Sequence, residues 1–184
     1  MSTDKENPMP HPTPTNETQH NVEDHNIVIR RVDYQNPRDA AALVMLLNAY
    51  AQDPMGGQEA LPAQTAATLC QRLAHFPGAA SWIAWAGEEP VGLLNSFMGF
   101  STFKARPLLN VHDIAVLPAW RGQGIAQQLL AAAEAHARAQ GCCKLTLEVL
   151  SNKTRAQHAY ERFGFALYTL DADQGHALFM QKWL

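Results

Sequence analysis

The chain has 184 residues, of which 47% are hydrophobic and 17% charged, and its 14 Lys and Arg against 17 Asp and Glu give a formal net charge of −3. This composition is typical of a folded globular protein and excludes a fibrous or wholly disordered chain. The mild acidity provides no basic surface for duplex nucleic acid or for an anionic membrane, so neither is an expected partner.

The sequence also gives an expectation for the cellular compartment. No run approaches the roughly 18 apolar residues of a membrane-spanning helix, and the polar N-terminus lacks the basic and apolar regions of a signal peptide. Only three cysteines occur, Cys70, Cys142 and Cys143, without a C-x-x-C spacing. This pattern predicts neither a disulfide framework nor a zinc site. We therefore expect a cytoplasmic protein without a metal.

The first 26 residues differ in composition from the rest of the chain. They contain four prolines, no aromatic residue, and five acidic side chains against one lysine. Such a segment buries too little apolar surface to offset the entropy lost on ordering. The sequence therefore predicts a disordered, Pro-rich acidic tail over residues 1–26, and a single domain of ordinary size over residues 27–184.

The first half of this domain alternates strand and helix patterns. A β-branched run predicts a strand over residues 27–29, and helical spacing predicts a helix over residues 33–50 with Tyr50 on its apolar stripe. A second helix is predicted over residues 63–75, ended by Phe76-Pro77-Gly78. Three strands follow, over residues 81–86, 91–100 and 108–117, and their short connections predict an antiparallel meander.

The second half contains a crossover. After Pro118, an Ala-rich helix is predicted that extends to residue 140, with Gly141 at its end, followed by a strand over residues 144–150. Because a helix joins this strand to the preceding one, the two should be parallel. A helix over residues 154–163 and a final hairpin, formed by residues 165–169 and 177–182 across a turn at 171–175, complete the chain. The expected fold is α/β, with a mixed, mostly antiparallel sheet, a central parallel βαβ crossover, and helices on both faces.

The most informative segment is Arg121-Gly122-Gln123-Gly124-Ile125-Ala126, between the last meander strand and the long helix. Glycines let backbone N–H groups approach a ligand closely, and a helix N-terminus adds unpaired donors and a partial positive charge. Arg121 adds a formal cation. The turn therefore suits a phosphate or pyrophosphate. It lacks the Gly-Lys-Ser/Thr ending of a nucleoside-triphosphate loop and the third glycine of a dinucleotide fold.

The remaining pattern, Arg-x-x-Gly-x-Gly/Ala, resembles the GNAT superfamily of acyl-CoA-dependent N-acetyltransferases. The resemblance extends over residues 27–184 in the order of elements, and its specific part covers residues 111–165. Beyond the glycine turn, it depends on the preceding Asp113-Ile114-Ala115-Val116-Leu117-Pro118 and on the downstream Ala156, Tyr160 and Gly164-Phe165.

The resemblance implies acetyl-CoA as cosubstrate, lying in a cleft where the strands at 108–117 and 144–150 splay apart. Backbone amides of Gly122, Gln123, Gly124, Ile125 and Ala126 would then hold the pyrophosphate. Main-chain groups of Ile114, Ala115 and Val116 would pair with the pantetheine arm and the thioester carbonyl, where an oxyanion develops during amine attack.

The same resemblance suggests the catalytic groups. Tyr160 matches the tyrosine that protonates the departing thiolate in many members; its alternative role is that of a core aromatic on an amphipathic helix. His112, Asp113 and Glu148 are the candidate bases, because all three lie on the two central strands. Strict alternation places His112 and Asp113 on opposite faces of the sheet. Histidine titrates near neutral pH, which suits a base, although a strand histidine is as often a hydrogen-bonded core residue.

One position departs from the family pattern. Many members carry an Asn seven residues before the tyrosine, where it contacts the cofactor arm, and this chain has Lys153 there with Asn152 one residue earlier. Either Asn152 takes over that contact, or Lys153 meets a cofactor phosphate.

The acceptor is expected to be a small cationic amine, because acidic residues lie in the segments that select the acceptor in this fold. Alternatives are a protein N-terminus or lysine as acceptor, and a non-catalytic acyl-CoA-binding module.

Family members commonly form homodimers, but the sequence does not fix the oligomeric state. The acidic residues are Asp53, Glu59, Asp171 and Asp173; the aromatic residues Trp82, Trp85, Phe97, Phe100 and Phe103 either line an acceptor pocket or belong to the core.

Overall fold

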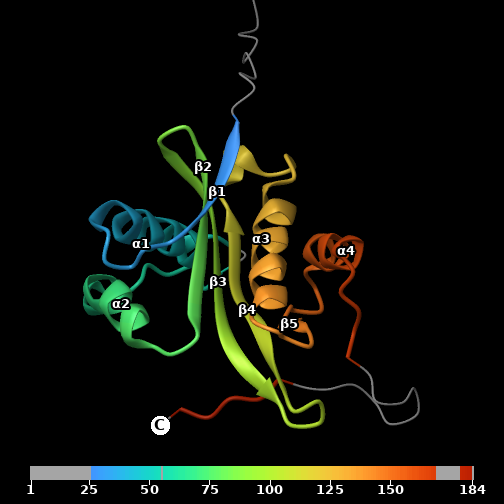
Figure 1. The fold of residues 1–184 in the computed structure, drawn as a ribbon. Coiled ribbons are helices and arrows are strands. Elements are labelled where there is room, and N and C mark those ends of the chain that lie inside the picture. The colour runs from blue at the N-terminus through green and yellow to red at the C-terminus, as the bar shows by residue number, and fades with distance from the viewer. Residues whose placement is uncertain (1–25, 55, 169–178, 184) are drawn as a thin grey trace, which may run out of the picture.

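The computed structural model describes residues 26–54, 56–168 and 179–183. It shows one five-stranded sheet in the order β1-β2-β3-β4-β5 (Figure 1). The first three strand pairs are antiparallel and β4–β5 is parallel, which confirms the mixed, mostly antiparallel sheet. The strands are β1 Ile27–Arg31, β2 Ala79–Ala86, β3 Glu89–Ser101, β4 Arg106–Val116 and β5 Leu145–Leu147.

Helices cover both faces of the sheet, as predicted (Figure 1). One face packs against α1 (Pro37–Gln52) and α2 (Ala63–His75), and the other against α3 (Ile125–Ala139). The last helix, α4 (Thr154–Phe163), lies beside α3, and the side chain of Gln127 donates to a carbonyl of α4 at 2.9 Å. Because helices cover both faces of the sheet, β2 is buried along nearly its whole length, and its side chains on both faces are mostly apolar.

Helix α1 begins four residues later than the predicted position 33. The side-chain oxygen of Asn36 accepts from the backbone N–H groups of Arg38 and Asp39, at 2.9 and 3.3 Å, and Pro37 occupies the first helical position. An Asn cap followed by Pro starts a helix because the cap satisfies unpaired donors and the ring fixes φ. The predicted start was therefore wrong, and the Asn-Pro pair determines the observed one.

The long Ala-rich helix does not begin directly after Pro118. A short 3-10 helix over Pro118–Trp120 is followed by a turn, and α3 begins only at Ile125. Gly122 and Gly124 have φ values of 84° and 77°, in the left-handed region that a right-handed helix cannot use. From Ile125 onward the predicted core residues Ile125, Leu129 and Ala133 are buried.

The C-terminal half of the sheet is smaller than expected. β5 has three residues instead of the seven predicted over 144–150. Its residues Leu145, Thr146 and Leu147 pair with β4. Residues 165–168 and 179–183 do not form strands, so the predicted hairpin does not extend the sheet in the described part of the chain. Its turn at 171–175 and the predicted disordered tail, except for Asn26, lie outside the described residues.

None of the helices in the described ranges is long and apolar enough to cross a membrane. The same ranges contain no group of three or more His, Cys, Asp or Glu side chains arranged to hold a metal ion. The three cysteines are unbridged, and Cys70 is buried.

Candidate active site

Strand β4 contains a β-bulge at the centre of the site. Asn95 of β3 pairs with Asp113, whereas the next residue, Ser96, pairs with Val111. His112 is therefore an extra residue without a partner directly opposite on β3. A bulge of this kind resets the alternation of side chains along the strand.

The bulge places His112 and Asp113 on the same face of the sheet, so the prediction of opposite faces was wrong. The His112 ring lies edge-on against Phe97, with centroids 5.3 Å apart, and Phe97 packs with the core cluster under α1 and α2. The Asp113 carboxylate accepts from Asn95 Nδ2 at 2.9 Å. Beyond the bulge, Ile114 and Val116 pack toward α3.

The pairing between β4 and β5 stops before the end of β4, at the place where the resemblance implies a cleft. The last pair is Val111 with Leu147, but β4 continues to Val116. In the described part of the chain, this stretch of β4 has no strand on its β5 side. The predicted pantetheine contacts, Ile114, Ala115 and Val116, all lie on this stretch, whose edge main-chain groups can therefore meet a ligand.

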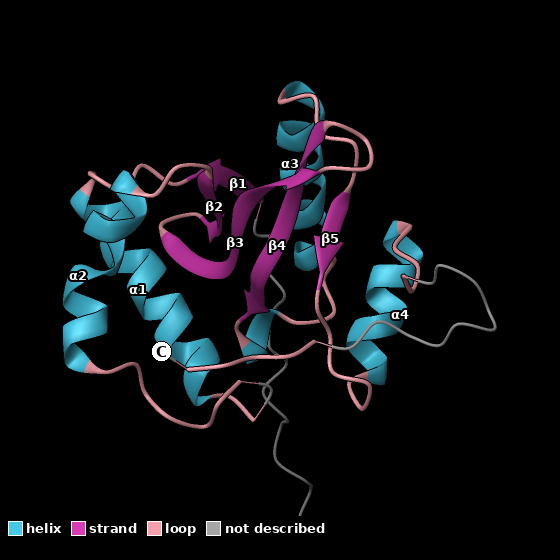
Figure 2. Cartoon of the chain, turned by 90° about the horizontal axis from the view of Figure 1, so that it is seen from below, coloured by secondary structure: helices cyan, strands magenta, loops and turns pink. Residues whose placement is uncertain are grey.

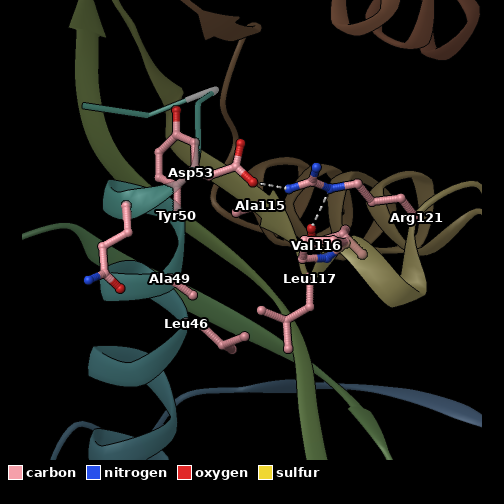
Figure 3. A pocket seen from close by; sticks show the side chains of 10 residues that line it. Leu46, Ala49, Tyr50, Asp53, Ala115, Val116, Leu117 and Arg121 are labelled. Atoms are coloured by element: carbon pink, nitrogen blue, oxygen red, sulfur yellow. Dashed lines mark hydrogen bonds and ion pairs between the residues drawn. The ribbon is translucent and has the colours of Figure 1, made fainter. Parts of the chain in front are cut away.

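A pocket of about 280 Å³ lies between the C-terminal end of α1 and the end of β4 (Figure 3). It includes three of the predicted cofactor-binding residues, and the ring of Tyr50 stands at its α1 side. The residues that line it are Leu46, Ala49, Tyr50, Gln52, Asp53, Ala115, Val116, Leu117, Pro118 and Arg121.

Arg121 joins the two walls of this pocket (Figure 3). Its Nε donates to the Val116 carbonyl at 2.9 Å, and its terminal nitrogen pairs with Asp53 Oδ2 at 2.7 Å. The cation expected beside the phosphate turn and the carboxylate expected on the acceptor rim are thus partners in one ion pair. Because the Asp53 side chain is only 11% exposed, this pair holds α1 against the turn more firmly than a surface pair would.

The glycine turn keeps its backbone donors available. Residues 122–124 are exposed, and none of the N–H groups of residues 122–126 donates to another described residue. The first N–H groups of a helix need an external acceptor, and these five lie in the turn before α3 and at its first two residues. Donors of this kind at a helix N-terminus suit an anion.

Tyr50 of α1 lies close enough to Tyr160 of α4 to affect the pKa of Tyr160. Burial, and secondly the neighbouring Tyr50, raise the pKa of Tyr160 from the usual 10.0 to about 12. Burial also raises the pKa of Tyr50, and the Asp113 and Asp53 carboxylates raise it further. In the view of Figure 2, the end of β4 lies between α1 and α4, consistent with these electrostatic contacts. Tyr50 does not stand out as a site residue in the sequence, because its helical spacing places it on a core stripe.

The other predicted residues lie around this centre. Glu148 is exposed just beyond β5, and both of its carboxylate oxygens accept from Asn110 Nδ2 at 3.3 Å. Asn152 is exposed. Lys153 reaches across to the loop after α1, where its Nζ donates to the Pro54 carbonyl at 3.3 Å.

The expected acceptor-pocket aromatics separate into two groups. Trp82 and Trp85 are buried in the core and Phe97 is half-buried, so these three favour the core alternative. Phe100 and Phe103 are 63% and 98% exposed, and neither lines the pocket between α1 and β4. Glu59 is exposed, and Asp171 and Asp173 lie outside the described residues.

Comparison with known proteins agrees with this geometry. Residues 43–165 match the acetyltransferase (GNAT) family. Streptothricin acetyltransferase of Streptomyces lavendulae is 39% identical over 97 residues, which is 48% of this chain and 51% of that protein. The structure of the aminoglycoside N-acetyltransferase AAC(6')-Iy in complex with CoA has a TM-score of 0.68 at 19% identity, over 85% of this chain and 95% of that chain. The structure of a ribosomal-protein-alanine N-acetyltransferase from Brucella melitensis biovar Abortus 2308 has a TM-score of 0.62 at 21% identity, over 85% of this chain and 100% of that chain.

The fold, the amide-lined turn and these matches define the class as acetyltransferase. The chain belongs to the acetyltransferase (GNAT) family, since the family match covers more than half of its length and includes the whole motif region. The chain spans about half the length of its streptothricin-acetylating relative. The two solved structures named above show the fold alone, and the two proteins are named for different acceptors.

Proposed function

We propose that this protein transfers an acetyl group from acetyl-CoA to the primary amine of a small cationic molecule, by direct attack in a ternary complex. The observation that carries the proposal is the meeting of three features at the end of β4. These are the amide turn at residues 122–126, the β4 edge without a β5 partner, and the Tyr50–Tyr160–Asp113 group.

The cofactor would extend from the turn toward the bulge. The amides of residues 122–126 would bind the pyrophosphate, and the edge of β4 at Ile114, Ala115 and Val116 would pair with the pantetheine arm. The pocket is lined by Ala115, Val116 and Arg121, so it lies beside the β4 edge and next to the first residue of the turn. Among the described residues, Asn152 makes no competing hydrogen bond and Lys153 is engaged with Pro54, which favours Asn152 for a cofactor contact.

The transfer needs one acid and one base. The amine nitrogen attacks the thioester carbonyl carbon, the C–S bond breaks, and the departing sulfur takes the Tyr160 proton. The second proton, which the nitrogen loses as the amide forms, returns to the Tyr160 oxygen. The ammonium form of the acceptor must lose a proton before attack, and Asp113, His112 and Glu148 are the groups that can accept it, directly or through water. A tyrosine with a raised pKa keeps its proton at neutral pH, as the acid role requires.

A small cationic acceptor fits the charge of this face. The bulge turns Asp113 toward α1 beside His112, and Glu148 lies along the same side of the sheet, at the end of β5. A carboxylate in a partly enclosed site binds an ammonium group more strongly than one in open solvent. The relative named for streptothricin supports a small-molecule acceptor.

The proposal is tested by measuring thiol release from acetyl-CoA with polyamines, amino acids, aminoglycosides and peptides as acceptors. We expect release with one or more small cationic amines and none with neutral or acidic ones. Release only with peptides would show a protein acetyltransferase instead. Acetyl-CoA binding without release for any amine would show a non-catalytic module.

The substitution Asp113→Asn should raise the KM of a cationic acceptor at least tenfold and leave the KM of acetyl-CoA within about twofold. Loss of a charge-assisted hydrogen bond costs about 1.5–3 kcal/mol, and about 1.4 kcal/mol is a factor of ten. Glu59→Gln removes the same charge from an exposed position and serves as the control. Equal KM changes in the two variants would contradict this role for Asp113.

A further inference from the structure

A row of buried polar side chains crosses three strands and ends at Asp113. Ser81 of β2 lies opposite Asn95 of β3, and Asn95 lies opposite Asp113 of β4. Ser81 and Asn95 are only 1% and 4% exposed. Ser81 Oγ donates to Asn95 Oδ1 at 2.6 Å, and Asn95 Nδ2 donates to Asp113 Oδ2 at 2.9 Å. Tyr34, in the segment before α1, places its hydroxyl 2.8 Å from Ser81 Oγ.

The charge at Asp113 sets the direction of every bond in this row. A carboxylate only accepts, so Asn95 must turn its amide nitrogen toward Asp113 and its oxygen toward Ser81. The single Ser81 hydroxyl proton then goes to Asn95, and the bond between Tyr34 and Ser81 must be donated by Tyr34. Burial raises the pKa of Tyr34, so this donor keeps its proton. All three donors therefore point toward Asp113.

The bulge is matched to this row. In an unbroken register, Asn95 would lie opposite His112, because Ser96 lies opposite Val111. The extra residue brings Asp113 to that place instead. Among the described residues, Asn95 is the one side chain that donates to the Asp113 carboxylate, and it contacts Oδ2, which leaves Oδ1 for another donor.

We propose that Tyr34, Ser81 and Asn95 are positioning residues that hold the Asp113 carboxylate, through Oδ2, in the orientation in which Oδ1 binds the acceptor ammonium. This inference rests on the proposed function and extends it to residues that never touch the substrate. A carboxylate already fixed in its binding orientation loses less rotational freedom when the amine arrives. Asp113 itself is half-buried, and donors aligned toward it also stabilise its negative charge cooperatively.

The test compares two serines with equal burial. Ser96 is also 1% exposed and is adjacent to Asn95, but its hydroxyl donates to the Ala80 carbonyl and lies outside the row. Ser81→Ala should raise the KM and the calorimetric Kd of a cationic amine about three- to tenfold, with an unchanged KM for acetyl-CoA. Ser96→Ala should leave all three constants at their wild-type values. Ser81→Thr, which keeps a hydroxyl, should restore amine binding.

Tyr34→Phe provides a second variant, should Ser81→Ala fail to fold. Tyr34 is half-buried, and its replacement removes only the last donor of the row, so we expect a smaller increase in the same amine constants. Equal effects of Ser81→Ala and Ser96→Ala, or equal increases for amine and acetyl-CoA, would overturn the positioning role.

Failure of the proposed function gives a different result. A wild-type protein that binds the amine without releasing thiol would remove the transfer reaction, while a selective loss of amine binding in Ser81→Ala would still support the row. A wild-type protein that releases thiol, with amine constants that do not respond to Ser81→Ala, would keep the function and remove the row. Absence of amine binding by the wild type would overturn both.

Discussion

Tyr160→Phe should lower kcat at least tenfold and leave the KM of acetyl-CoA nearly unchanged. The substitution removes only the hydroxyl. The ring can keep its edge-on contact with Phe165, whose centroid is 6.0 Å away, and its place beside the α3 core. Without the phenol, the departing thiolate must take its proton from water, and general acid catalysis typically contributes about 10²–10⁴-fold. Steady-state kinetics with a saturating acceptor measure the effect.

The raised pKa of Tyr160 predicts the pH range of this effect. The pKa is displaced upward to about 12, first by burial and then by Tyr50. The protonated acid is therefore present throughout neutral and mildly alkaline pH. At pH values below about 11, its ionisation should not reduce kcat. The same shift stabilises the folded state below pH 10, the usual value, and that contribution is lost as the pH rises through 12.

Tyr168→Phe is the control for the hydroxyl, because Tyr168 is 58% exposed and lies outside the proposed site. It should leave kcat at the wild-type value. A Tyr160→Phe enzyme within twofold of wild type would assign Tyr160 to the core instead. A fall in kcat between about pH 8 and 10 that this variant abolishes would show that the acid ionises with an ordinary tyrosine pKa.

The sequence predicted the elements well where local signals decide them. The bounds of α2 and α4 agree with the prediction at both ends, because the segment after α2 begins with Phe76-Pro77-Gly78 and α4 is followed by a left-handed Gly164. The helix after Pro118 begins later than its first residue could, because Gly122 and Gly124 have left-handed φ values, and α3 therefore begins at Ile125.

The centre of the site depends on contacts that local patterns do not encode. The bulge at His112 follows from pairing with Asn95 and Ser96, so alternation along β4 alone gave the wrong face. The ion pair between Arg121 and Asp53 joins positions 68 residues apart. Tyr50 has the same spacing as core residues of α1, and only the fold shows that the helix ends at a pocket. The family pattern supplied the site residues, whereas their mutual orientation required the tertiary structure.

Gly124→Ala should weaken acetyl-CoA binding at least tenfold, with little change in the KM of the amine. Gly124 has a φ of 77°, and a left-handed backbone costs a residue with a Cβ about 1–2 kcal/mol. No atom lies within 4 Å of an added Cβ, so the protein itself leaves room for the methyl group. The loss should therefore fall on the ligand, because relaxation of the strained turn redirects the amides that bind the pyrophosphate. One charge-assisted hydrogen bond is worth about 1.5–3 kcal/mol, which is a factor of ten or more.

Gly141→Ala isolates the contribution of the ligand from that of backbone strain. Gly141 follows the other end of α3, has a φ of 70°, and also has no atom within 4 Å of an added Cβ. The two variants should therefore lose similar amounts of thermal stability, whereas only Gly124→Ala should lose the calorimetric signal for acetyl-CoA. Equal affinities in the two variants would mean that the cofactor does not depend on this turn. Since the proposed reaction draws its thioester from a cofactor anchored there, that result would remove the basis of the mechanism.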